Sequence, residues 1–166
     1  ANFVLGFSAK QLNRDVTIDG QTTNQLGRFI KAGMFESKPR KFVASKLPSL
    51  ASLDDPHASL EHKVRSYLDA NCSHCHRPGR YAGRWDGRSE KPLAKQRIIN
   101  GDAIFHAFAD PGAKVVVPGD LNESYMFHRM ASTQPHMQMP PLGRYVIDYK
   151  AVQVVKQWIE SLPPGE

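Results

Sequence analysis

The chain has 166 residues, of which 40% are apolar and 23% are charged, and its formal net charge is +6. These values suit one globular domain with a sizeable core. No stretch approaches the roughly 20 apolar residues that a membrane-spanning helix needs, so no membrane span is expected. The start of the chain lacks the basic and apolar regions of a signal peptide, so we expect either a processed protein or a module of a larger one.

The N-terminal third predicts little regular structure. A short strand is expected at residues 16–18, ending at an Asp-Gly turn. A helix is expected over residues 22–34, because Thr22 and Gln25 have the spacing of a capping box and apolar side chains follow on one helical face. Residues 36–56 predict a connecting segment, since prolines repeatedly interrupt the weak periodicity there.

The clearest predicted helix begins near residue 56 or 59 and ends at Asn71. Its apolar side chains recur at the spacing of a helix with one face toward the core. They are Leu60, Val64, Tyr67 and Leu68. This helix leads directly into a cysteine.

Beyond residue 78 the expected elements are short. Helices are predicted around residues 93–100 and 124–131, and a last one lies between Asp148 and Pro163. Strand signals are few, chiefly the three valines at residues 115–117. The sequence therefore predicts a mainly α protein.

The segment Cys72-Ser73-His74-Cys75-His76 has the form of a covalent haem attachment site. Its two thiols, three positions apart, can bond to the two vinyl carbons on one edge of a haem. The histidine directly after the second thiol then lies beneath the iron, where its neutral imidazole can ligate. We therefore predict one haem c, attached through two thioethers at Cys72 and Cys75, with His76 as an axial ligand. Because such bonds are made outside the cytoplasm, a periplasmic or secreted protein is expected.

Two other interpretations of the cysteine pair are less favoured. A structural zinc site usually adds a second, distant pair of ligands, whereas the remaining histidines are scattered singly. A thioredoxin-like redox pair follows a strand, whereas these cysteines follow a helix. A zinc-stabilised binding module stays as an alternative.

The second axial ligand is predicted to be Met139. A residue before proline favours an extended conformation, and Pro140 and Pro141 stiffen the segment, so the sulfur loses little entropy on ligation. Met137 would point to the same side of an extended segment and is the main competitor. His136 lies beside both and could also reach the iron, and the two methionines could instead be buried apolar residues. The remaining candidates are Met34, Met126 and Met130, of which core packing explains the last two.

A basic segment follows the motif. Between Arg77 and Arg97 the chain has seven basic and two acidic residues. This charge could steer an acidic partner, balance haem propionates or belong to a solvated loop. Trp85, Arg88 and Tyr81 are candidates for hydrogen bonds to the propionates. Nucleic acid is not expected as a partner, because no stacking-aromatic or recognition-helix pattern accompanies the charge.

The stretch from Tyr67 to Gly79 resembles the haem segment of a bacterial group of exported monohaem cytochrome c domains. The resemblance extends to Leu5-Gly6-Phe7-Ser8, Gln11-Leu12-Asn13-Arg14, Thr23-Asn24-Gln25-Leu26, Val117-Pro118-Gly119-Asp120, Arg129-Met130 and Met139-Pro140-Pro141-Leu142-Gly143. Such domains occur within or at the end of multidomain proteins of sugar or polysaccharide oxidation. Some accompany copper-dependent lytic polysaccharide monooxygenases.

The resemblance implies a cytochrome c-like helical core around one haem, with His76 and Met139 as axial ligands and electron transfer as the activity. It also implies that the N-terminal segment belongs to the same folding unit. The expected organisation is one domain, with an extension of residues 1–56 that wraps a haem-binding core of residues 57–166. The implied partner is a redox protein, such as a lytic polysaccharide monooxygenase or a quinoprotein dehydrogenase, and the expected form is a monomeric module of a larger protein.

The predicted function is therefore that of an electron carrier with six-coordinate iron. No paired carboxylates at a recognisable spacing and no nucleophile motif are found, so an enzyme is not expected. The alternative is an open-face haem enzyme or gas sensor of peroxidase type. It would require that no methionine ligates and that His136 or Arg144 assists catalysis.

Overall fold

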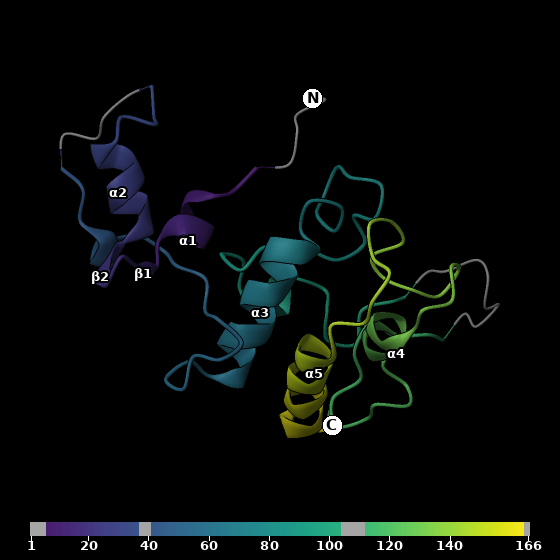
Figure 1. Ribbon diagram of the computed structural model, residues 1–166. Coiled ribbons are helices and arrows are strands. Elements are labelled where there is room, and N and C mark those ends of the chain that lie inside the picture. The colour runs from purple at the N-terminus through teal and green to yellow at the C-terminus, as the bar shows by residue number, and fades with distance from the viewer. Residues whose placement is uncertain (1–5, 37–40, 104–111, 165–166) are drawn as a thin grey trace. The chain divides into compact units, whose positions relative to one another are not determined.

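The computed structural model describes residues 6–36, 41–103 and 112–164, so Leu5 of the stretches quoted above lies outside the described residues. Contacts divide the chain into two compact units, Ala1–Leu50 and Ala51–Glu166. The elements drawn in Figure 1 are, in chain order, α1 (Ala9–Leu12), β1 (Asp15–Ile18), β2 (Gln21–Asn24), α2 (Gln25–Lys31), the 3-10 turn η1 (Ala44–Lys46), α3 (Leu60–Asn71), the 3-10 turn η2 (Leu93–Lys95), α4 (Tyr125–Ala131) and α5 (Tyr149–Ser161).

The N-terminal unit is built on a β-hairpin. Strands β1 and β2 pair antiparallel, with Val16 opposite Thr23. Asp19 and Gly20 join them with φ values of 52° and 75°, the positive values that a tight hairpin turn requires. The strand expected at residues 16–18 is therefore present, and the sequence pattern missed its partner.

The predicted capping box at Thr22 is not formed. Thr22 lies in β2, where its hydroxyl is 2.7 Å from that of Thr17. Helix α2 begins later, and its first turn is capped by Asn24, whose Oδ1 accepts a hydrogen bond from the Gly27 N–H at 3.0 Å. The helix is shorter than expected because the hairpin uses the residues assigned to its first turn.

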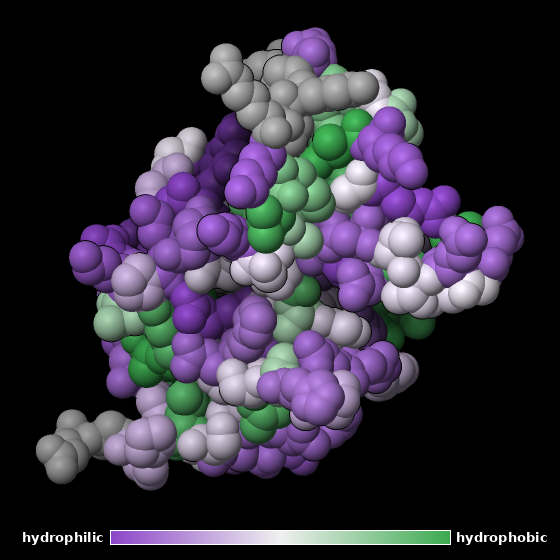
Figure 2. Space-filling view, turned by 90° about the vertical axis from the view of Figure 1, so that its left-hand side faces the viewer, coloured by the Kyte–Doolittle hydropathy of each residue, from purple (hydrophilic) through white to green (hydrophobic). Residues whose placement is uncertain are grey.

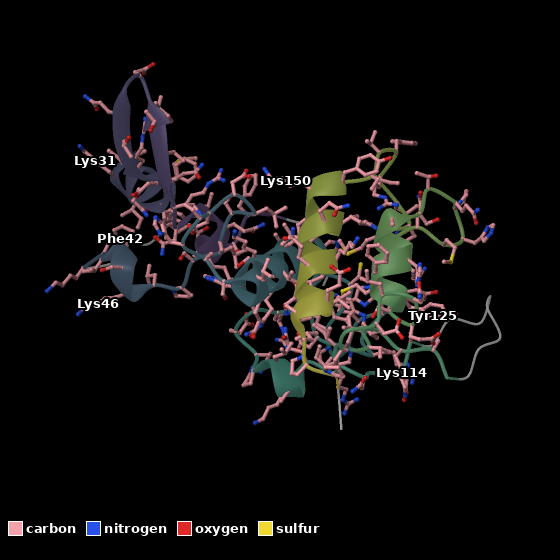
Figure 3. All side chains as sticks on the ribbon, turned by 90° about the horizontal axis from the view of Figure 1, so that it is seen from below. Lys31, Phe42, Lys46, Lys114, Tyr125 and Lys150 are labelled. Carbon is pink, nitrogen blue, oxygen red and sulfur yellow. The ribbon has the colours of Figure 1, made fainter. Side chains whose placement is uncertain are left out.

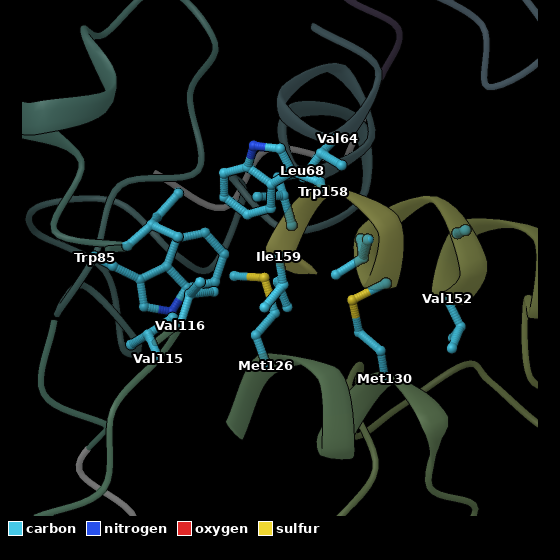
Figure 4. Close-up of a cluster of buried hydrophobic side chains, with 13 residues drawn as sticks. Val64, Leu68, Trp85, Val115, Val116, Met126, Met130, Val152, Trp158 and Ile159 are labelled. Atoms are coloured by element: carbon cyan, nitrogen blue, oxygen red, sulfur yellow. The ribbon is translucent and has the colours of Figure 1, made fainter. Parts of the chain in front are cut away.

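The second unit packs α3 and α4 against α5. Val64 and Leu68 of α3 belong to one buried cluster with Val155, Trp158 and Ile159 of α5, and Figure 4 shows this cluster. Burying each of these large side chains contributes roughly 1.5–3 kcal/mol. Both long helices begin at side-chain caps, which fixes where each one starts: Ser59 accepts from the His62 N–H, and Asp148 accepts from the Ala151 N–H.

The prediction of a mainly α protein with a cytochrome c-like helical core is wrong. Helices cover only about a third of the described residues, and a two-stranded antiparallel sheet is present. The helix expected at residues 93–100 is reduced to the turn η2, and of residues 115–117 only Val116 and Val117 form isolated bridges. Residues 93–100 contain no glycine or proline, but Arg97 and Asn100 have φ values of 56° and 51°, which a right-handed helix does not allow. Elsewhere, glycines and prolines interrupt the periodic stretches.

The surface on view in Figure 2 is mostly hydrophilic, with smaller hydrophobic patches. None of the helices in the described part of the chain combines the length and the apolar character that crossing a bilayer requires.

Candidate cofactor site

A cavity of about 760 Å³ lies in the second unit. Its walls come from the end of α3 and the loop after it, from α4, and from the segment that leads into α5. This volume falls in the range of roughly 300–1,000 Å³ that cofactor and small-molecule sites occupy. Several core residues, among them Leu68 and Val152, form part of the wall, so the cavity is continuous with the hydrophobic core.

The four residues predicted to bind a cofactor all line this cavity: Cys72, Cys75, His76 and Met139. The last of them is far from the other three in the sequence, and the fold brings it to the same space. Met137, the expected competitor, is not among the lining residues, and neither is His136. The roles of the four residues as ligands stay predictions.

Two further methionines line the cavity instead. Met126 and Met130 are four positions apart in α4, and both belong to the buried cluster. In Figure 4 their side chains rise from α4 toward α5. The first residue of α4, Tyr125, donates its N–H to the Lys114 carbonyl at 3.1 Å, and Figure 3 labels both residues near the same end of this helix. The competing sulfur atoms are thus those of α4.

The cysteine motif continues the end of α3 as a series of tight turns. The Cys72 N–H donates to the Leu68 carbonyl at 2.9 Å, and the His76 N–H donates to the Cys72 carbonyl at 2.8 Å. Both thiols are free of disulfide bonds, and Cys75 is exposed. Burial, together with the neighbouring Cys75, raises the pKa of Cys72 to about 12, so its thiol is protonated at neutral pH.

The imidazole of His76 is held neutral. Burial lowers its pKa to about 4, and the positive charge of Arg129 acts in the same direction. Hydrogen bonding with the Ala82 backbone acts in the opposite direction and raises the pKa. The Nδ1 atom of the ring is buried and forms no hydrogen bond of ordinary geometry with any described residue. The ring stacks on Trp85, with centroids 4.1 Å apart and planes at 21°. A neutral, desolvated imidazole in a cavity is the form that ligates a metal.

A hydrogen-bonded frame supports the motif from behind. Asp69 of α3 accepts from the Ser89 N–H and from the Ser89 hydroxyl, each at 2.7 Å. The Gly87 N–H donates to the His76 carbonyl at 2.8 Å. A Cβ at Gly87 would lie 3.1 Å from the Ser73 Cα, so the loop approaches the motif as closely as glycine allows.

The basic residues divide into two groups. Arg84, Arg129 and Arg144 line the cavity. Arg88 does not line it: its guanidinium binds Asp86 with Nε–Oδ1 at 2.9 Å and Nη2–Oδ2 at 2.6 Å. This hydrogen bonding lowers the pKa of Asp86 and raises the pKa of Arg88. Arg88, predicted as a partner of the haem propionates, is thus paired with Asp86 and does not lie at the cavity.

The other two propionate candidates differ from each other. Trp85 is buried against His76, whereas Tyr81 is fully exposed at the edge of the cavity. Sequence reasoning missed the Trp85–His76 stack and the place of Arg129. Of the two, only the place of Arg129 could have been predicted from the sequence, because Arg129 lies three positions after Met126 and so shares its face of the predicted helix.

The lining residues fit a haem. The walls are largely apolar, and two free thiols and a neutral imidazole line the same cavity. Three arginines also line it and supply positive charge near the place of two carboxylates. Among residues 6–36, 41–103 and 112–164, no three histidine, cysteine, aspartate or glutamate side chains gather as a metal-binding group.

Comparison with known proteins agrees with this fit. Residues 72–143, less than half of the chain, match the family described as Planctomycete cytochrome C. No curated protein and no solved structure matches the chain. The matched segment begins at Cys72 and extends past Met139, so it contains every predicted cofactor-binding residue. The match supports a cytochrome c domain with covalently bound haem c, the general activity of which is electron transfer.

Proposed function

We propose that the second unit is an electron carrier in which one haem c is attached at Cys72 and Cys75 and is ligated by His76 and Met139. One observation carries the proposal: these four residues line a single cavity of about 760 Å³ although Met139 is remote in sequence. The family match over residues 72–143 supports the attachment chemistry.

The chain's own residues would serve a bound haem in three ways. His76 is neutral and offers a lone pair. Met139 offers a thioether, a ligand that favours the reduced iron and closes the second face to small molecules. The apolar walls exclude water, which reduces the reorganisation that accompanies a change of iron charge. When bound, the haem supplies the one-electron exchange between ferric and ferrous iron.

We place this carrier outside the cytoplasm, with a redox protein as its partner. The exported domains that the sequence resembles suggest a lytic polysaccharide monooxygenase or a quinoprotein dehydrogenase. Arg80 and Arg84, on the loop that follows the motif, are exposed and suit a partner with an acidic docking surface.

An open-face haem enzyme has weaker support. His136, one of the two groups that could assist such catalysis, is exposed and does not line the cavity. Arg144 does line it, but its guanidinium donates to the carbonyls of Met130 and Ser132. Neither group is thus available at the iron in the way that a peroxidase requires.

An optical experiment tests the proposal. The protein is produced in a host that attaches haem, and the ferric spectrum is recorded. A low-spin spectrum with the weak sulfur-to-iron band is expected, lost in Met139→Ala and retained in Met137→Ala. Met126→Leu and Met130→Leu, which roughly conserve volume, should also retain it. A high-spin spectrum of the unmutated protein would overturn the proposal.

A further inference from the structure

The segment that presents Met139 is fastened to the last turn of α4 through one residue, Arg129. The Arg129 side chain donates from Nε to the Met137 carbonyl at 3.0 Å. In return, the Arg129 backbone carbonyl accepts the Met139 N–H at 2.9 Å. Residues 137 and 139 are therefore both held by the same residue of the helix.

This attachment uses groups that a helix leaves unsatisfied. The last four carbonyls of an α-helix have no partner within the helix, and Arg129 lies in that last turn. The Met139 N–H supplies the missing donor. Before this contact, the chain closes a turn in which the N–H groups of Met137 and Gln138 both donate to the Gln134 carbonyl, at 2.9 Å and 2.8 Å.

The consequence is a difference between two neighbouring methionines. With its carbonyl bound by the Arg129 side chain, Met137 does not line the cavity, whereas Met139 does. The sequence favoured Met139 and made Met137 its main competitor, because both would point to the same side of an extended segment. The two contacts with Arg129 hold the backbone where only Met139 reaches the cavity.

We infer that Arg129 is a positioning residue that selects Met139 over Met137 as the sulfur ligand of the iron. The inference rests on the proposed function, since it assumes a sulfur ligand. It assigns Arg129 no contact with the iron and no part in the electron exchange.

Arg144 offers a matched control. It also lines the cavity and is partly buried, but it donates to the carbonyls of Met130 and Ser132, at the end of α4, and makes no hydrogen bond to residues 137–139 among those that the structure describes. Arg144→Gln therefore removes a positive charge from the cavity wall and leaves both Arg129 contacts in place. Arg129→Gln removes a similar charge together with the bond to Met137.

The test uses the haem-loaded protein and two readouts: the sulfur-to-iron band of the ferric state and the affinity for added imidazole, which competes with the sulfur. Arg129→Gln is expected to weaken the band and to tighten imidazole binding about tenfold, equivalent to about 1.4 kcal/mol. Met137→Ala should lower the remaining band only in the Arg129→Gln background. Arg129→Lys, which lacks the Nε donor, should change in the same direction by about threefold, while Arg144→Gln stays within about twofold.

The possible outcomes distinguish a failure of the inference about Arg129 from a failure of the proposed function. An unmutated protein without the sulfur band refutes the proposed function and the inference with it. A band in the unmutated protein that is unchanged in Arg129→Gln overturns the inference alone, as does an equal change in Arg144→Gln. If Arg129→Gln does not fold, as judged by circular dichroism, an Arg129→Lys protein with unchanged imidazole affinity overturns it.

Discussion

Removing the carboxylate of Asp69 should destabilise the protein from directly behind the cysteine motif. Asp69 is 8% exposed and lies in the last turn of α3. One of its oxygens accepts both the N–H and the hydroxyl of Ser89, each at 2.7 Å. Its backbone carbonyl accepts the Ser73 hydroxyl at 2.6 Å. The residue thus ties the helix that leads into the motif to the loop that passes beneath it.

The size of the effect follows from these contacts. A hydrogen bond to a charged group contributes about 1.5–3 kcal/mol, and Asp69→Ala also leaves the Ser89 N–H without its acceptor. Because both bonds share one oxygen, we expect a combined loss of about 3 kcal/mol, equivalent to about 10 °C in the midpoint of thermal unfolding. Asp69→Asn keeps an acceptor oxygen and should lose about 1 kcal/mol.

Thermal unfolding of the haem-loaded protein, followed by circular dichroism, measures this loss. The matched control is Asp54→Ala, which removes the same side chain from an ion pair with Lys150 in which both side chains are more than half exposed. Exposed pairs contribute about 0–1 kcal/mol, so the control should unfold within a few degrees of the unmutated protein. Equal midpoints for Asp69→Ala and Asp54→Ala would refute the assignment of a supporting role to Asp69.

Three further predictions concern the site. In the haem-free chain the folded-state pKa of His76 is lowered to about 4, so between about pH 6.5 and pH 4 the unfolded state binds a proton that the folded state does not. Stability should fall by about 3 kcal/mol as the pH drops through this window, and urea titrations of His76→Gln should lack that part of the loss. Gly87→Ala, crowding the Ser73 backbone, should cost about 1–3 kcal/mol and lower the fraction of chains that carry haem, measured by mass spectrometry. Electron exchange with an acidic partner should slow as salt rises, and Arg80→Gln with Arg84→Gln should flatten that dependence in stopped-flow traces.

Local signals predicted the parts of the fold that local interactions determine. Helix α3 ends at Asn71 as its apolar spacing indicates, and α5 begins after Asp148, whose side chain caps it. The hairpin shows where such signals fail. Thr22 satisfies the spacing of a capping box, but pairing with β1 outweighs it, and that pairing depends on residues outside the helix.

The residues of the candidate site also differ in whether local or long-range interactions place them. Three of its predicted residues lie within five positions of one another: Cys72, Cys75 and His76. The turns after α3 are therefore enough to bring them to one cavity. The place of Met139 at the cavity needs long-range information. Its segment is held by Arg129, whose contacts join two segments that no spacing rule connects.

The shortness of the helices is consistent with the cavity's place in the core. Leu68, Trp85, Val115, Met126 and Met130 belong both to the buried cluster and to the cavity wall, so the two are one apolar region with a space inside it. Protein interiors are close-packed, and a space of about 760 Å³ forfeits many contacts unless something fills it. A large flat cofactor bound there would contribute apolar contact area that longer helices otherwise supply, and covalent attachment would keep it in place. On this reasoning the abundance of loops in the second unit and the covalent motif would have one cause, because a haem bound in the cavity would serve as part of the core as well as the redox group that we propose.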